Sequence, residues 1–214
     1  MKNKFLLLIA LIISLNSFCQ KTNLVLEKKI DEIYTIYNES CKTSKDKILG
    51  KYPKTNIKEL EKTKDYIDDY SLFLREKEKH QLTKISELKN LLRKTEIDNP
   101  FIGEQITITK DSNNSDAQIK ILTSNVSEIR NDLAAKFNED YSDYSDDPVI
   151  RTKINFVVDS DGKLKKISCT GENEEMNLYT SLLLYSLDKR INPLIEENKI
   201  IPQYFTIPLS LNFQ

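Results

Sequence analysis

Residues 149–170 read VIRTKINFVVDSDGKLKKISCT, and this stretch decides the fold. Val149–Val158 alternates between apolar and polar residues, which is typical of a strand with one side on a core. The side toward the core carries Ile150, Ile154, Phe156 and Val158. Asp159–Lys163 has the Asp and Gly residues of a tight turn. Leu164–Thr170 predicts a second strand, with Ile167 and Cys169 toward the core. The stretch therefore predicts an antiparallel β-hairpin.

A third strand is predicted at the end of the chain. Apolar residues recur there at every second position: Phe205, Ile207, Leu209, Leu211 and Phe213. The residues that point the other way are Tyr204, Thr206, Pro208, Ser210 and Asn212. Pro208 cannot donate to a ladder, so this strand should lie at a sheet edge. An open edge can bind an extended peptide by strand addition, but a proline can equally protect the edge from pairing. The outward residues are therefore candidate peptide-binding residues.

Two helices should cover the apolar face of this sheet. One follows the second strand, and its inward residues are Met176, Tyr179, Leu182 and Leu183. The other begins with a capping pattern at Asn125 and Glu128. Its inward residues are Val126, Ile129, Leu133 and Phe137. Ahead of that helix, Gln105–Lys110 and Gln118–Thr123 predict a further β-hairpin.

Residues 20–99 read as a helical hairpin. Its first helix has one apolar stripe, made by Leu26, Ile30, Ile33 and Tyr37. Gly50 and Lys51–Thr55 break the pattern, and a second helix should run from Asn56 to Thr95. One heptad position of this helix holds Leu60, Ile67, Leu74 and Leu88. Polar residues interrupt the seam, so a hairpin is favoured over a coiled coil.

The first residues have the pattern of a targeting segment. Lys2 and Lys4 precede the apolar run Phe5–Ile13, and the run is too short for a membrane span, which needs about 20 residues. This pattern predicts a signal peptide over residues 1–19 and export to the periplasm or cell envelope. An uncleaved inner-membrane anchor and a lipoprotein attached through Cys19 are the alternatives.

The order and spacing of the C-terminal segments resemble the TonB C-terminal domain family, in its Bacteroidota-like form. The resemblance is carried by Phe137-Asn138, Phe156-Val157-Val158-Asp159, Asp161-Gly162, Asn192-Pro193, Asn198-Lys199 and Phe205–Leu209. It covers about residues 120–214. It implies a three-stranded antiparallel sheet with helices on one face, which grips a short extended motif of an outer-membrane transporter by strand addition.

The chain departs from an energy transducer of that family. It has 6 prolines in all and no Pro-rich spacer, and a leader stands where the membrane anchor would be. The resemblance therefore implies the binding half of the mechanism and not the transmission of force. The predicted fold class is α+β: a small antiparallel sheet with helices on one face within residues 100–214, preceded by the helical hairpin region.

Catalytic chemistry has little support in the sequence. His80 is the single histidine and lies in a charged helix, which leaves no His-based nucleophile pair in the C-terminal domain. The Asp-Ser-Asp-Gly stretch at 159–162 lacks the distal Glu of a calcium loop, so a turn is favoured. For Cys41 and Cys169, two buried thiols are favoured over a disulfide. We expect no enzymatic activity, no cofactor and no metal.

Two functions remain from the sequence. With a net charge of −1 and no concentrated basic face, the chain is not expected to bind nucleic acid. We expect an exported protein-binding module whose partner is an extended segment of an outer-membrane or other envelope protein. The alternative is an adaptor that assembles, for example as a homodimer, through its long N-terminal helix. An open edge on the last strand would favour the first function. An edge covered by the predicted hairpin of residues 105–123 would favour the second.

Overall fold

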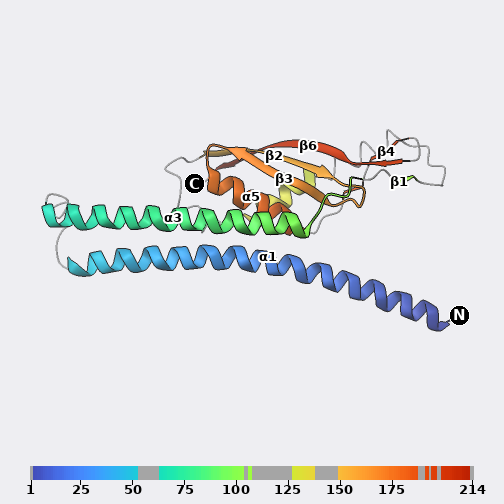
Figure 1. Ribbon diagram of the computed structural model, residues 1–214, viewed down its shortest axis with the longest axis horizontal. Coiled ribbons are helices and arrows are strands. Elements are labelled where there is room, and N and C mark those ends of the chain that lie inside the picture. Colours follow the sequence, from blue (N-terminus) through green and yellow to red (C-terminus); the bar gives the residue numbers. More distant parts are fainter. Residues whose placement is uncertain are drawn as a thin grey trace.

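A computed structural model describes residues 2–52, 63–103, 106–107, 127–137, 149–187, 191–192, 194–196 and 199–212. These residues form a long helical hairpin and an α+β domain that lies along part of it (Figure 1). The α+β class, the small antiparallel sheet and the helices that the sequence predicts are all present.

The hairpin consists of α1 (Lys2–Lys51) and α3 (Lys64–Asp98), which run antiparallel and in contact (Figure 1). The predicted start of the second helix at Asn56 lies outside the described residues. The observed end at Asp98 agrees with the predicted end near Thr95 and before Asn99-Pro100. The helix continues to the last position before Asn99-Pro100, because a residue that precedes proline is disfavoured in helical conformation.

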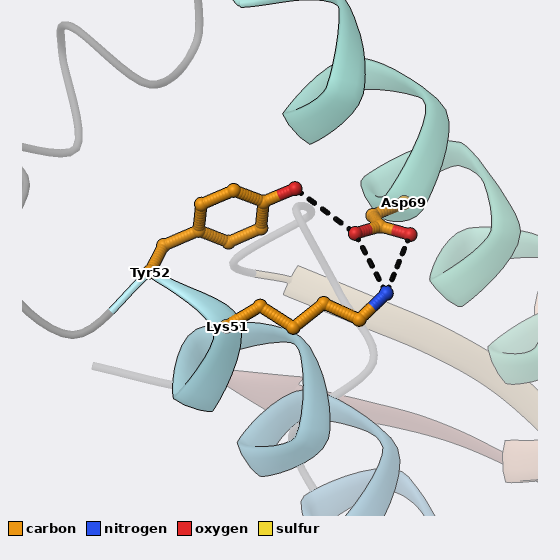
Figure 2. Close-up of polar contacts among 3 residues, drawn as sticks. All are labelled: Lys51, Tyr52 and Asp69. Atoms are coloured by element: carbon orange, nitrogen blue, oxygen red, sulfur yellow. Dashed lines mark hydrogen bonds and ion pairs between the residues drawn. The ribbon is translucent and has the colours of Figure 1, made fainter.

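Polar contacts join the two helices at the tip of the hairpin. Lys51 Nζ lies 2.9 Å from both carboxylate oxygens of Asp69, and the Tyr52 hydroxyl donates to the same carboxylate at 3.0 Å (Figure 2). These hydrogen bonds hold the pKa of Asp69 below its ordinary value. The end of α1 is thereby fixed against the first turns of α3.

The main sheet confirms the strands that the sequence predicts. β2 (Val149–Val158) is central, with β3 (Leu164–Gly171) on one side and β6 (Gln203–Asn212) on the other, all antiparallel. In the turn between β2 and β3, Gly162 has a φ of +78°, a conformation that glycine adopts without strain. The Gly162 N–H donates to the Asp159 carbonyl at 2.8 Å and closes the turn.

The carboxylate of Asp159 explains why this turn begins with an acidic residue. It is fully buried and accepts the main-chain N–H groups of Ile102 at 2.7 Å, Ser160 at 2.8 Å and Gly103 at 3.2 Å. Burial alone would raise the pKa of Asp159, but these N–H groups lower it below its ordinary value. The turn favoured by the sequence is thus confirmed, and its carboxylate ties the segment after α3 to the sheet.

Helices cover one face of the sheet. α5 (Glu174–Ser186) and helix 127–136 pack on the apolar side of β2, β3 and β6, with parts of α1 and α3 behind them (Figure 1). The predicted core residues that are buried here are Ile129, Leu133, Ile154, Phe156, Val158, Ile167, Met176, Tyr179, Leu182, Leu183, Ile207 and Leu209. Phe137, Cys169 and Phe205 are partly buried against them. Asn125, Val126, Phe213 and the side chains of Ile150 and Leu211 lie outside the described part.

A second small sheet was not predicted. β4 (Leu194–Glu196) and β5 (Lys199–Ile201) form a hairpin, and β1 (Ile106–Thr107) pairs with the outer side of β5. Most of the predicted hairpin Gln105–Thr123 lies outside the described residues. β1 lies within the predicted strand Gln105–Lys110, but its pairing with β5 was not predicted, because the two segments are far apart in sequence. β4 and β5 were missed because each has only 3 residues.

The heptad row predicted for the second helix is only half correct. Leu88 is fully buried, whereas Ile67 and Leu74 are 49% and 47% exposed. The difference follows from the length of α3: its first half extends beyond the sheet, and α1 is the element it contacts among those described (Figure 1). The stripe on α1 is confirmed: Ile30 and Tyr37 are buried, with Tyr34 added between them.

A buried ion pair joins the hairpin to the α+β domain. Lys84 Nζ of α3 lies 2.7 Å from a carboxylate oxygen of Glu175 on α5, and both side chains are almost fully buried. The ammonium group also lies 3.8 Å from the ring centre of Tyr37 and 5.1 Å from that of Tyr34, both on α1. Burial lowers the pKa of Lys84 to about 8, although Glu175 opposes this shift. Burial also raises the pKa of Glu175.

We expect Glu175→Ala to destabilise the protein by about 3–5 kcal/mol, because it leaves the ammonium group of Lys84 buried without its counter-ion. The double variant Lys84→Met/Glu175→Leu should recover most of this loss, because it removes both desolvated charges. Urea unfolding at neutral pH measures both effects. A double variant as unstable as Glu175→Ala would show that the unpaired ammonium group of Lys84 is not the cause of the loss.

Lys84 should also make the stability depend on pH. In the folded protein it releases its proton near pH 8, whereas the unfolded chain keeps that proton up to pH 10.5. Between these values the unfolded state binds more protons, so this contribution to stability rises with pH and is lost as pH falls through 8. The double variant should lack the rise. If the difference in free energy of unfolding between the wild type and the double variant stays constant over this pH range, the lowered pKa of Lys84 is wrong.

Candidate peptide-binding edge

The side chains of β6 alternate as predicted. Ile207 and Leu209 are buried in the core. The candidate residues Tyr204, Thr206, Pro208 and Ser210 are exposed on the opposite face, with Tyr204 at 71%. Asn212 closes the strand, and its backbone alone is described. The structure therefore brings the predicted site residues together on one strand.

The direction of the main-chain groups follows from contacts at Pro208. Pro208 has no N–H, and its carbonyl accepts a hydrogen bond from Arg130 Nη2 of helix 127–136 at 3.3 Å. Its partner on β2 is Lys153, whose carbonyl accepts the Thr170 hydroxyl from the β3 side at 3.5 Å. Both contacts indicate that Pro208 and Lys153 form a non-hydrogen-bonded pair, in which the two residues exchange no main-chain hydrogen bonds with each other. The main-chain groups of Pro208 therefore face away from β2.

This orientation extends along the whole strand, because main-chain groups alternate in direction from one residue to the next. β6 pairs with β2 in unbroken register from Gln203 to Asn212. The residues whose main-chain groups face outward are then Tyr204, Thr206, Pro208, Ser210 and Asn212. These residues are the ones that carry the outward side chains. In the described part of the chain no strand pairs with this edge, since β1 pairs with β5.

At the opposite edge of the sheet, side chains of α5 bond to main-chain groups of β3. On β3, the Ile167 N–H donates to the Tyr185 hydroxyl at 3.2 Å, and the Gly171 carbonyl accepts from Asn177 Nδ2 at 3.0 Å. Both side chains belong to α5, which therefore uses main-chain groups of the β3 edge. Among the described side chains, Arg130 alone makes such a contact on the outer edge of β6. Among the described residues, fewer side chains therefore occupy the β6 edge than the β3 edge.

A hollow with cationic walls lies beside this edge. It has a volume of about 720 Å³ and includes residues of β6 from Pro208 to Ser210. The charged residues in its described lining are Arg130, Arg151 and Lys153, without a carboxylate. A peptide that pairs with this end of β6 would therefore bring its side chains close to positive charge.

Sequence reasoning did not select these cationic residues. Arg151 and Lys153 could have been found, because they occupy the outward positions of the alternating segment Val149–Val158. Arg130 could not, because only the packing of helix 127–136 brings it to Pro208. Local periodicity identifies the face of a strand, but it does not identify which helix reaches the edge of a sheet.

Other reactive groups form no second site in the described part of the chain. Cys41 and Cys169 are both free thiols, and burial raises the pKa of Cys169 to about 11. His80 is half-buried on α3. No group of His, Cys, Asp and Glu side chains suited to a metal ion is found among the described residues. None of the helices described is long and apolar enough to cross a membrane.

The outer edge of β6 combines three features that bear on function. Its features are a strand with outward main-chain groups, exposed side chains on one face and a cationic hollow at one end. Comparison of the chain with protein-family models, with curated proteins and with solved structures finds no match.

Proposed function

We propose that this chain is an exported, non-enzymatic protein-binding module of the cell envelope, which holds an extended peptide by strand addition along β6. The observation that carries the proposal is the outward direction of the main-chain groups of β6 beside an edge that no described strand occupies. The resemblance to TonB C-terminal domains supports the same mode of binding. The proposed partner is a segment of an outer-membrane or other envelope protein, with a link to TonB-dependent transport.

Main-chain hydrogen bonds would supply most of the affinity. Each such bond contributes about 0.5–1.5 kcal/mol, and side chains at alternate positions of the peptide set specificity. Pro208 interrupts the row of donors, and its carbonyl is held by Arg130. The peptide would therefore form its main-chain hydrogen bonds on either side of Pro208, with Thr206 and with Ser210.

The hollow adds a chemical preference. Arg130, Arg151 and Lys153 would attract a peptide with an acidic side chain near the Pro208–Ser210 end of the strand. A charged residue at the rim of a binding site mainly changes the rate of association and how strongly that rate depends on salt concentration. Acidic peptides should therefore bind faster at low ionic strength.

The test is a proline at Ser210. Peptides selected from a random library displayed on phage should bind the Ser210→Pro protein roughly two- to tenfold more weakly, because one main-chain donor is lost. The matched control Ser210→Ala keeps the N–H and should bind as the wild type does. Fluorescence anisotropy with a labelled selected peptide gives the affinities.

Urea unfolding of proline variants distinguishes residues whose N–H faces the open edge from residues whose N–H bonds to β2. Ser210→Pro should unfold at nearly the wild-type urea concentration, because its N–H faces outward. Ile207→Pro should be far less stable than Ile207→Ala, because Ile207 faces β2 and proline removes a ladder bond. If folded Ser210→Pro binds the selected peptides as tightly as Ser210→Ala does, strand addition at β6 is wrong.

A charge reversal tests the hollow separately. Arg151→Glu should slow the association of acidic selected peptides several-fold at low salt and leave neutral ones unchanged, because it removes a cation from the lining. Arg93→Glu is the control, since Arg93 is exposed on α3 and does not line the hollow. Stopped-flow measurements at two salt concentrations give the rates. Equal slowing by both variants would mean that net charge, and not the hollow, attracts the peptide.

One observation favours the second candidate function, an adaptor that assembles through the helical hairpin. α3 exposes Leu72 at 55% and Leu82 at 63%, and apolar side chains in such positions can serve as a contact between copies. Sedimentation equilibrium distinguishes the two functions. A stable dimer that Leu72→Glu or Leu82→Glu dissociates would support the adaptor.

A further inference from the structure

A second, independent site lies in the part of the hairpin that extends beyond the sheet. Here α1 and α3 enclose a groove with a volume of about 970 Å³. This is within the size range of small-molecule pockets, which form between helices as well as at domain interfaces. The groove lies on the helical half of the chain, away from β6 (Figure 1).

The charged residues in the described lining of the groove are all lysines. They are Lys42 and Lys45 of α1 and Lys77 of α3, and no carboxylate is among the described lining residues. Contacts at both ends fix the register of the two helices, because Lys51 meets Asp69 near the tip and Tyr37 meets Lys84 further along. Midway between these contacts, Lys77 comes opposite the segment from Lys42 to Lys45. The three lysines therefore occupy positions at about the same level of the groove.

The part between the lysines and the tip is apolar. Ile48 and Leu49 line it from α1, and Tyr66, Ile67, Tyr70 and Phe73 line it from α3. The Tyr66 and Tyr70 rings stack with centres 5.8 Å apart, and Tyr52 packs edge-on against Tyr66 at 5.5 Å. At the tip, the contacts of Asp69 with Lys51 and Tyr52 join the two helices (Figure 2). The groove thus has a cationic part and an apolar part that ends at a polar bridge.

We propose that this groove binds a small anionic amphiphile, with its anionic group at Lys42, Lys45 and Lys77 and its hydrocarbon tail between the helices toward the tip. The charge complementarity selects the anionic group, and the aromatic and aliphatic lining selects the tail. From the level of Lys45 to the end of α1 at Lys51 the helix rises about 9 Å, which suits a tail of medium length. Fatty acids and single-chain anionic lipids share this chemistry.

The probe for the test is decanoate, used with the full chain below the concentration at which decanoate forms micelles. Isothermal titration calorimetry should show one saturable site. Decanol and decyltrimethylammonium have the same tail with a neutral or a cationic group, and they should bind at least tenfold more weakly. Equal binding of all three compounds, or no binding of decanoate, would overturn the proposal. Decyl phosphate, whose tail nearly matches that of decanoate, distinguishes a phosphate headgroup from a carboxylate.

Variants on α1 locate the site. Lys45→Glu should weaken decanoate binding at least tenfold, whereas Lys47→Glu should leave it unchanged, because Lys47 is exposed on the same helix but does not line the groove. Tyr70→Ser should weaken decanoate and decanol alike, since it changes the tail part of the groove. Circular dichroism and thermal unfolding show that each variant is folded. Unchanged binding by folded Lys45→Glu would place the ligand elsewhere and reject the site.

A second copy of the chain is the competing occupant. Sedimentation equilibrium of the wild type with and without decanoate tests it. A monomer under both conditions agrees with the proposal. A dimer that Tyr70→Ser dissociates and that decanoate does not affect would show that the groove is a protein interface.

Discussion

The contact between Lys84 and Glu175 joins the two halves of this molecule. Moving two charges out of water costs several kcal/mol per ion, so the contact is favourable only when the helices bring the groups together with good geometry. Here α3 supplies the cation, α5 supplies the anion, and α1 adds Tyr37 against the ammonium group. The pair lies where α3 packs against α5, beside the apolar residues of the core. The α+β domain covers the second half of α3, and the first half extends past it (Figure 1).

The central position of β2 determines how the two outer strands differ. α5 follows β3 after a short connection and packs beside it, so its side chains Asn177 and Tyr185 reach the main-chain groups of that edge. β6 comes last in the chain and receives Arg130 from helix 127–136 instead. One edge of the sheet is therefore satisfied by the fold, and the other keeps a row of outward main-chain groups. This asymmetry is what makes β6 the candidate docking strand.

Both candidate sites are locally cationic although the chain as a whole carries a net charge of −1. Arg151 and Lys153 gather beside β6, and Lys42, Lys45 and Lys77 gather along the hairpin groove. Net charge describes the average field, whereas a ligand meets the charges that line its own site. The two sites differ in the rest of their lining, since one offers main-chain hydrogen bonds and the other offers aromatic rings. They should therefore select different ligands.

Local pattern determined a large part of this fold. The alternation in Val149–Val158 and around Phe205–Leu209 sets strand position and face without any knowledge of the partner, because side chains in a strand point to opposite sides by geometry. The Asp-Gly turn and the proline in the last strand likewise predicted a hairpin and an edge, and both are present. The five outward residues of the candidate site follow from the same alternation.

Only the tertiary structure decided the contacts between segments distant in sequence. It paired β1 with β5, buried Lys84 in a helix whose other lysines are exposed or only partly buried, and brought Arg130 to Pro208. It also left Ile67 and Leu74 exposed, although they share a heptad position with the buried Leu88. A periodic pattern records which side of an element is apolar. How far a neighbouring element extends along that side depends on packing across the whole chain, and no local stretch of sequence contains that information.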